Sequence, residues 1–292
     1  MDALPASLWS GSGAPAPRWL TWCWSSAAVV VLLACQPAPP TYVDPTGTTI
    51  QTRFPTPEGF TRASYPTRSF AAYLRDRPLE PHGSKVYLYD GREKNTQRVH
   101  AAVLDVDVGR RDLQQCADAV MRLRAEYLWS EERYNDISFN FVSGFPAEYR
   151  RWRGGERIRV RGNTVNWVPG GGPDASYAAF RKYLTMVFAY AGTASLVHEL
   201  KPRPLEDITV GDVFIRGGSP GHAVIVVDKV VDSAGEAMVL LAQSFMPAQD
   251  IHVLLNPLAT DGNPWHRVAD MEEEVRTAEH LFAPDELRHF PE

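Results

Sequence analysis

Residues 211–228 read Gly-Asp-Val-Phe-Ile-Arg-Gly-Gly-Ser-Pro-Gly-His-Ala-Val-Ile-Val-Val-Asp. Two apolar runs on either side of a glycine-rich turn predict neighbouring strands, over 210–215 and 223–231. His222 follows the turn directly and opens the second run. A histidine at the entrance of a buried strand has a fixed backbone and a reachable ring, which are the properties a general base requires.

The next apolar run, 237–242, predicts a strand that pairs with the one opened by His222. If the hairpin is centred on Ser233 and Ala234, residue 245 lies opposite His222, and Gln243 is a diagonal neighbour on the same face. The Gln243 amide could then hold one ring nitrogen of His222 and leave the other free. A shift of one residue would turn Gln243 away.

Two other residues remain candidates for the role of orienting His222. Asp228 shares the face of His222 if the strand keeps a strict period of two, although it lies at the far end of the strand. Gln249 follows the third strand. The sequence therefore predicts a polar partner for His222 and favours Gln243.

The clearest helix is predicted over 113–129, a run rich in Ala, Leu, Arg and Glu without Gly or Pro. Asp112 and Gln115 have the spacing of a capping box. Cys116 then lies in the first turn, where the helix dipole and free backbone N–H groups stabilise a thiolate. Because buried cysteines are common, the helix alone leaves inert packing and catalysis equally open.

The remaining elements complete a helix followed by a mostly antiparallel sheet, an α+β layout. We predict a hairpin from 85–89 and 99–108, a strand over 157–161, a helix over 177–190, a strand over 251–255 and a short amphipathic helix over 272–280.

The N-terminal region predicts export. Residues 1–34 have the character of a signal peptide, because a single arginine precedes an apolar run too short to span a bilayer. The tetrad Leu32-Leu33-Ala34-Cys35 resembles the bacterial lipobox, which implies lipidation of Cys35. An ordinary secretory leader or an uncleaved anchor is the alternative. The proline-rich stretch 35–49 predicts an extended tether, and 50–292 a single domain.

Export would leave Cys116 as the one remaining free thiol, because Cys23 lies in the leader and Cys35 carries lipid. Gln36, in place of the aspartate that marks inner-membrane retention, favours the outer membrane. The net charge of −5 gives no indication of nucleic-acid binding. The histidines lack the short spacing of a helical metal pair, and we expect no cofactor.

The order of these features resembles the papain-like thiol hydrolases of bacterial cell walls, the NlpC-type group. Those proteins have a cysteine at the start of a helix, a Gly-Asp strand, a histidine heading the next strand and a polar residue on the strand after. The resemblance implies a papain-like fold with Cys116 as nucleophile, His222 as base and Gln243 as orienting residue.

A closer resemblance covers nearly all of the predicted domain. The motifs at 113–128, Gly211–Val224 and 241–249 resemble the bacterial domain-of-unknown-function family 4846. We therefore expect a lipid-anchored envelope cysteine hydrolase or acyltransferase that acts on amide bonds, with peptidoglycan stem peptides or another envelope peptide as substrate. The alternative is a non-catalytic envelope lipoprotein that uses the same cleft for binding.

Overall fold

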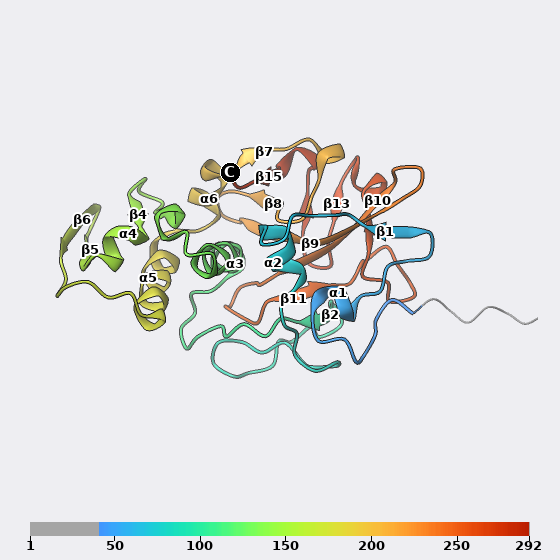
Figure 1. Cartoon of the computed structure of the whole chain (residues 1–292), viewed down its shortest axis with the longest axis horizontal. Coiled ribbons are helices and arrows are strands. Elements are labelled where there is room, and N and C mark those ends of the chain that lie inside the picture. Colours follow the sequence, from blue (N-terminus) through green and yellow to red (C-terminus); the bar gives the residue numbers. More distant parts are fainter. Residues whose placement is uncertain (1–40, 292) are drawn as a thin grey trace, which may run out of the picture. The chain divides into compact units, whose positions relative to one another are not determined.

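A nine-stranded sheet with antiparallel pairing throughout organises residues 41–291, which are those that the computed structural model describes (Figure 1). The strand order is β2-β11-β10-β9-β8-β15-β7, with β1 alongside β9 and β12 alongside β10. This arrangement confirms the predicted α+β class and mostly antiparallel sheet. The predicted signal peptide and Cys35 lie outside the described residues.

The strands of this sheet are β1 (Phe60–Arg62), β2 (His100–Val103), β7 (Lys201–Pro202), β8 (Val213–Arg216), β9 (His222–Asp232), β10 (Ala237–Gln243), β11 (His252–Leu254), β12 (His266–Arg267) and β15 (Leu287–His289). Three separate hairpins are β3 (Ser138–Asn140) with β4 (Pro146–Glu148), β5 (Glu156–Arg161) with β6 (Thr164–Pro169), and β13 (Val275–Arg276) with β14 (Leu281–Phe282).

The helices are α1 (Ile50–Arg53), α2 (Phe70–Arg75), α3 (Cys116–Ser130), α4 (Tyr149–Arg153), α5 (Tyr177–Tyr190) and α6 (Thr193–Glu199). Short 3₁₀ turns occupy Tyr134–Asp136, Leu205–Asp207, Ala269–Met271 and Pro284–Glu286. In the described residues, no helix combines the length and the apolar character needed to cross a membrane.

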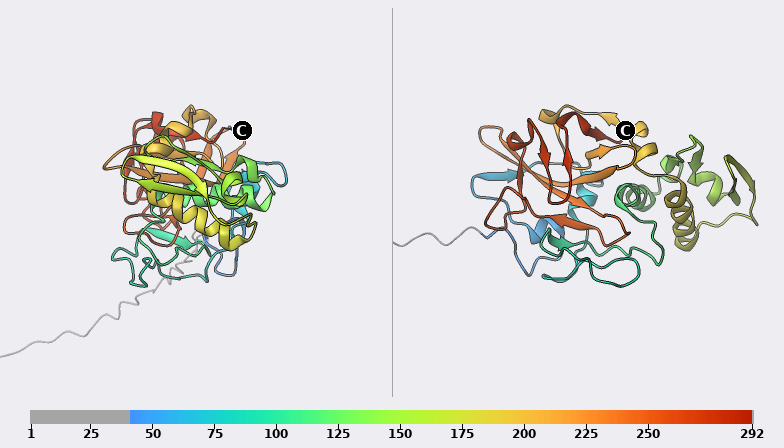
Figure 2. Two further views of the ribbon diagram at one scale, coloured as in Figure 1. Left: turned by 90° about the vertical axis from the view of Figure 1, so that its left-hand side faces the viewer. Right: turned by 180° about the vertical axis from the view of Figure 1, so that it is seen from behind.

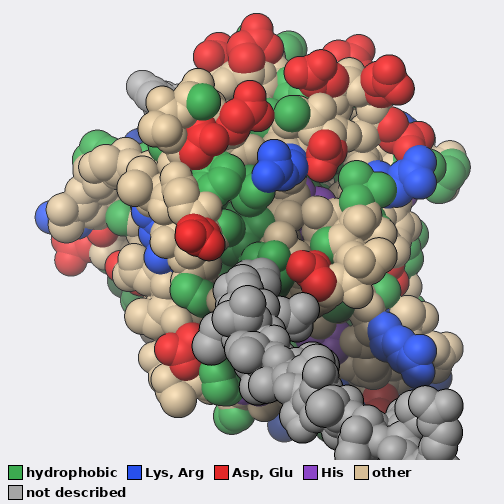
Figure 3. All heavy atoms as spheres, turned by 90° about the vertical axis from the view of Figure 1, so that its right-hand side faces the viewer, with side chains coloured by type: hydrophobic (Ala, Val, Ile, Leu, Met, Phe, Trp, Pro, Cys, Tyr) green, Lys and Arg blue, Asp and Glu red, His purple; other side chains and the backbone are tan. Residues whose placement is uncertain are grey.

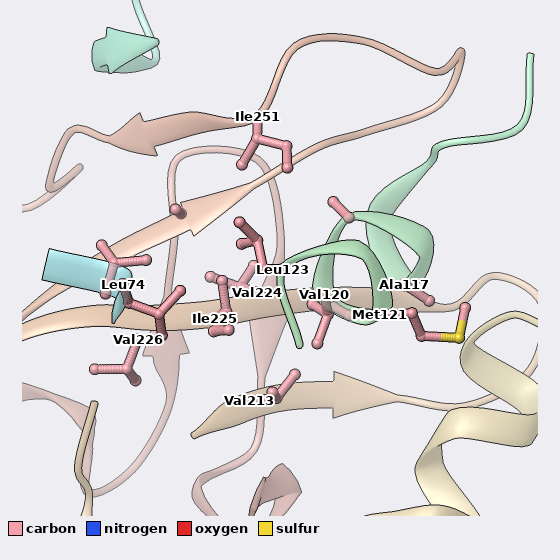
Figure 4. Packing of buried hydrophobic residues seen from close by; sticks show 14 of the residues in the cluster. Leu74, Ala117, Val120, Met121, Leu123, Val213, Val224, Ile225, Val226 and Ile251 are labelled. Carbon is pink, nitrogen blue, oxygen red and sulfur yellow. The ribbon is translucent and has the colours of Figure 1, made fainter. Parts of the chain in front are cut away.

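The central strand β9 is covered on both faces. Helices α2 and α3 lie on one face, and the hairpin β13–β14 lies on the other, as the front and back views show (Figures 1 and 2). Figure 4 shows Val120 and Leu123 of α3 next to buried side chains of β8 and β9. Burying a Val or Leu side chain fully contributes about 1.5–3 kcal/mol, so this packing fixes the position of α3 on the sheet.

Most of the predicted helix and strand bounds agree closely with the structure. Helix α5 has the predicted bounds, 177–190, and β8, β9, β10 and β11 lie within three residues of the predicted strands. The predicted strand 157–161 is β5, which pairs with β6 across a turn where Gly162 has a φ of 57°. That conformation favours glycine because it has no Cβ.

Two predicted elements are wrong. Residues 85–89 and 99–108 do not form a hairpin, because the Gln97 side chain bonds to both backbone groups of Val86, at 3.0 and 2.9 Å, and β2 pairs with β11 instead. Residues 272–280 do not form a helix. They contribute β13 and a turn in which the Thr277 hydroxyl donates to the His280 carbonyl at 2.9 Å.

The predicted tether overlaps with packed structure at its C-terminal end. The Asp44 N–H donates to the carbonyl of Arg53 at 2.7 Å, and Thr49 caps α1 and forms a bridge with Pro78. These contacts exist because Arg53 is buried and its guanidinium donates to the Gly47 carbonyl at 2.7 Å. Residues 44–49 therefore belong with the folded domain.

The surface is acidic in places. Figure 3 shows Asp and Glu side chains gathered on the upper part of one face, with few basic side chains among them. A site for nucleic acid needs a basic patch to neutralise phosphates, and this part of the surface has the opposite charge.

Candidate active site

Helix α3 begins at Cys116, three residues later than predicted. Gln115 is the N-cap residue, and its backbone N–H donates to Asp118 at 3.1 Å. The predicted cap at Asp112 is wrong, because the Asp112 carboxylate accepts from the Ala248 N–H at 2.7 Å and from the Gln115 side chain at 3.0 Å. Cys116 is consequently the first residue of the helix.

The Cys116 thiol is nearly buried, with 6% of the residue exposed. Burial raises the pKa of the thiol to about 11, although the backbone N–H groups of Ala117, Ala223 and Cys116 itself lower the pKa. The helix start therefore supplies the donors that the sequence predicted, but their effect is smaller than that of burial. At neutral pH the thiol is protonated, contrary to the expected thiolate.

His222 and Gln243 meet as the sequence predicted. The ring nitrogen Nε2 of His222 lies 2.7 Å from Oε1 of Gln243. The ring is 2% exposed and lies against the C-terminal segment, with ring centres 5.0 Å from His280 and 6.0 Å from Phe282. Burial lowers the pKa of His222 to about 4, so the imidazole is neutral at pH 7.

A β-bulge in β9 sets the register that brings these two side chains together. Near the turn, Leu240 pairs with Asp228, but Leu241 pairs with Val226, so Val227 is an extra residue on β9. Ala242 then pairs with Ile225, which is the register predicted for the His222 end. Between the bulge and the β9–β10 turn, the pairing of β9 with β10 is shifted by one residue from the predicted register.

The same bulge removes Asp228 from the candidate site. Because Leu240 and Leu241 face opposite sides of the sheet, Asp228 and Val226 do as well, so the predicted shared face of Asp228 and His222 is wrong. The buried Asp228 carboxylate instead pairs with Arg75 at 2.5 Å and Arg62 at 2.7 Å. Gln249, the other alternative, is buried and forms a bridge with Leu88.

The thiol and the imidazole lie near the start of β9 but on opposite faces of the sheet. Cys116 belongs to helix α3 on one face, and the backbone N–H of Ala223, the residue after His222, lowers the pKa of its thiol. The His222 ring points toward the segment that covers the other face. Among the described residues, no hydrogen bond joins the thiol to the ring.

A pocket of 270 Å³ opens at Cys116. Its lining comes from the helix start, the glycine-rich turn before His222, and neighbouring residues: Asp112, Leu113, Gln115, Cys116, Ala117, Asp118, Phe188, Ala191, Gly192, Thr193, Gly218, Ser219, Pro220, Gly221 and Met246. Asp118 is 5% exposed, and its Oδ1 has no hydrogen-bond partner among the described residues. The pocket thus combines a thiol with an unsatisfied polar atom.

Sequence reasoning missed a partly buried carboxylate behind Gln243. Glu279 accepts from the Gln243 amide at 2.7 Å and from Lys94 at 2.6 Å, and it lies 3.8 Å from His252. Burial raises the pKa of Glu279, but the contacts with His252 and Lys94 have a larger and opposite effect and bring the pKa down to about 2. Lys94 lies in a loop and Glu279 in a turn, so neither of these two residues belongs to a periodic sequence pattern that could have predicted it.

Other pockets have fewer groups that could act in catalysis. One of them, of 710 Å³, is lined by Glu80, Asp105, Asp107 and Asp250, among others, and its lining includes no cysteine or histidine. Within residues 41–291, no cluster of three or more His, Cys, Asp or Glu side chains is arranged to hold a metal ion.

Comparison with known proteins identifies a family but no activity. A family described as "Domain of unknown function (4846)" matches residues 50–289. No curated protein and no solved structure matches this chain. Since the match covers most of the sequence, the chain belongs to the domain-of-unknown-function family 4846.

Proposed function

We propose that this protein is a cysteine hydrolase or acyltransferase that acts on amide bonds. The supporting observation is the 2.7 Å contact between His222 Nε2 and Gln243 Oε1, at the entrance of the strand against which the helix that begins at Cys116 packs. Papain-like enzymes use the same chain order of nucleophile, base and orienting amide. The papain-like, NlpC-like assignment belongs to this proposal.

The proposed mechanism starts from a neutral pair. Because the pKa of Cys116 is about 11 and that of His222 about 4, the substrate-free site holds a protonated thiol and a neutral imidazole. In the proposed step, Nδ1 of His222 must reach the helix face of the sheet at the start of β9, where it accepts the thiol proton while sulfur attacks the substrate carbonyl. The amine leaves with that proton, and water or an acceptor amine releases the acyl group. The backbone N–H of Cys116 helps to stabilise the oxyanion.

The pocket favours small and neutral or cationic acyl groups. Its volume of 270 Å³ lies below the range of drug-sized sites, and its glycines and alanines leave room close to sulfur. It is lined by Asp112 and Asp118, and by no lysine or arginine among the described residues. Stem peptides of peptidoglycan have small residues and free amino groups, which suits this lining. Lipidation at Cys35 and an outer-membrane location would bring the domain to that substrate.

The variant Cys116→Ala tests the nucleophile. We expect it to lose turnover of any muropeptide that the wild type cleaves, measured by mass spectrometry of the products. We also expect an unchanged circular dichroism spectrum, because the substitution removes only one buried sulfur atom. Ser233→Ala, in the distant β9–β10 turn, is the matched control. Retained turnover in Cys116→Ala would rule out the proposed role of Cys116.

A non-catalytic binding module is the second candidate. The burial and raised pKa of Cys116 favour it, because an unreactive thiol packs as a small apolar group. The two functions predict different results for the same variant. A binding module would bind muropeptides equally well with alanine at 116 and would release no cleavage product in either form.

A further inference from the structure

The Glu279 carboxylate determines which group donates and which accepts in each hydrogen bond of the chain that ends at His222. Glu279 Oε2 lies 2.7 Å from Nε2 of Gln243, and Gln243 Oε1 lies 2.7 Å from Nε2 of His222. Lys94, 7% exposed, holds the carboxylate from the other side at 2.6 Å. The chain of contacts therefore runs from Lys94 through Glu279 and Gln243 to the imidazole.

The chemistry of these groups leaves one assignment of protons. An ionised carboxylate only accepts hydrogen bonds, so the Gln243 group that faces Glu279 must be the amide NH₂. The amide oxygen then faces His222, and it also only accepts. His222 must donate through Nε2, which leaves Nδ1 without a proton.

We propose that Glu279, held by Lys94, is a positioning residue that selects the Nε2-protonated tautomer of His222. Its consequence for catalysis rests on the proposed function, because Nδ1 is the atom that would take the Cys116 proton. Without the carboxylate, the Gln243 amide can rotate and present its NH₂ to the ring. Nε2 then becomes the acceptor, the proton moves to Nδ1, and the base is lost.

The other ionisable groups around the pair are neutral histidines or belong to a closed ion pair, since Arg216, opposite His222 on β8, is bound to Glu286 at 2.6 Å. His252 lies 3.8 Å from Glu279, and His280 contacts the His222 ring. Burial lowers the pKa of both histidines, so both are neutral at pH 7. Lys94 is the cation that faces Glu279 at close range, and the cluster is electrically balanced.

Nitrogen-15 NMR of the histidine rings in the full chain, without substrate, tests this proposal. In the wild type we expect the His222 proton on Nε2. In Glu279→Gln the amide at 279 can accept or donate, and we expect a measurable fraction of Nδ1–H tautomer. Glu279→Asp keeps an acceptor-only group, and we expect it to restore the wild-type state. Glu274→Gln, on the same hairpin but paired only with the exposed Arg276, is the matched control.

A wild-type His222 protonated on Nδ1 would overturn the proposal, and this measurement decides even if Glu279→Gln fails to fold. An unchanged tautomer in a folded Glu279→Gln would overturn it too. The tautomer measurement tests the positioning role of Glu279, whereas turnover of the same variants tests whether His222 acts in catalysis. We expect turnover in Glu279→Gln to fall in proportion to the fraction of His222 that is protonated on Nδ1, because that tautomer cannot accept the thiol proton. A shifted tautomer with unchanged turnover would instead remove His222 from the mechanism.

Discussion

The neutral thiol–imidazole pair predicts how Cys116 reacts with iodoacetamide as pH changes. With a pKa of about 11, the thiolate fraction at pH 7 is about 10⁻⁴, whereas a free thiol with a pKa of about 8.5 has about 3% thiolate. The ratio is about 300-fold. A more basic thiolate is intrinsically more nucleophilic, with a Brønsted coefficient of about 0.4–0.5, which recovers about 10- to 20-fold.

We therefore expect Cys116 in the folded protein to react at least about 20-fold more slowly at pH 7 than cysteine in an unstructured model peptide. The 6% exposure of Cys116 slows the reaction further. The logarithm of the rate should rise by about one per pH unit between pH 6 and 10, because each unit multiplies the thiolate fraction by about ten. Intact-mass spectrometry of timed samples measures this rate.

The variant His222→Asn is the informative control, because it removes the imidazole and keeps a polar group of similar size. If the pair is neutral, the slope of the pH profile should not change. A rate that is independent of pH below 8 in the wild type, and that becomes pH-dependent in His222→Asn, would show a preformed thiolate–imidazolium pair. That result would refute the neutral starting state.

Two further predictions concern stability. Asp228→Asn should lower the free energy of unfolding by about 3–5 kcal/mol, because it leaves the buried Arg75 without its partner. Urea titration measures this loss, and Asp270→Asn on the surface is the control. Equal losses in the two variants would contradict this reasoning. Glu199 has a folded pKa of about 7, raised by burial above an ordinary value of 4.5, so its stabilising contribution is present below pH 4.5 and is lost as pH rises through 7. Glu199→Gln keeps the acceptor for the Asn140 N–H. Between pH 4.5 and 7.5 its free energy of unfolding should rise relative to that of the wild type by up to about 3 kcal/mol. A difference in stability between the two proteins that does not change with pH would contradict the raised pKa of Glu199.

The sequence predicted the parts of the site that follow a periodic pattern. The glycine-rich turn and the β-branched run placed His222 at a strand entrance, and the hairpin register brought Gln243 to its ring. The helix with Cys116 was predicted from its composition, though not its cap. These features depend on local propensity and on the period of two, which neighbouring residues determine.

The rest of the site depends on contacts between distant segments. The bulge at Val227 has no local signal, yet it moves Asp228 to the other face and corrects the register at His222. Glu279 and Lys94 are separated by 185 positions and meet only because the C-terminal hairpin covers the sheet. Burial, which reverses the expected thiolate at Cys116, is likewise a property of the whole fold.

The central claim is that Cys116 and His222 act as one chemical unit, and trapping of the acyl-enzyme tests it most directly. Wild type and His222→Asn are incubated with a mixture of muropeptides, quenched with acid and weighed by intact-mass spectrometry. We predict an acyl adduct on Cys116 in the wild type and none in His222→Asn, while both thiols are fully alkylated after unfolding. An adduct that forms at the same rate in both proteins, or on a residue other than Cys116, would contradict the account.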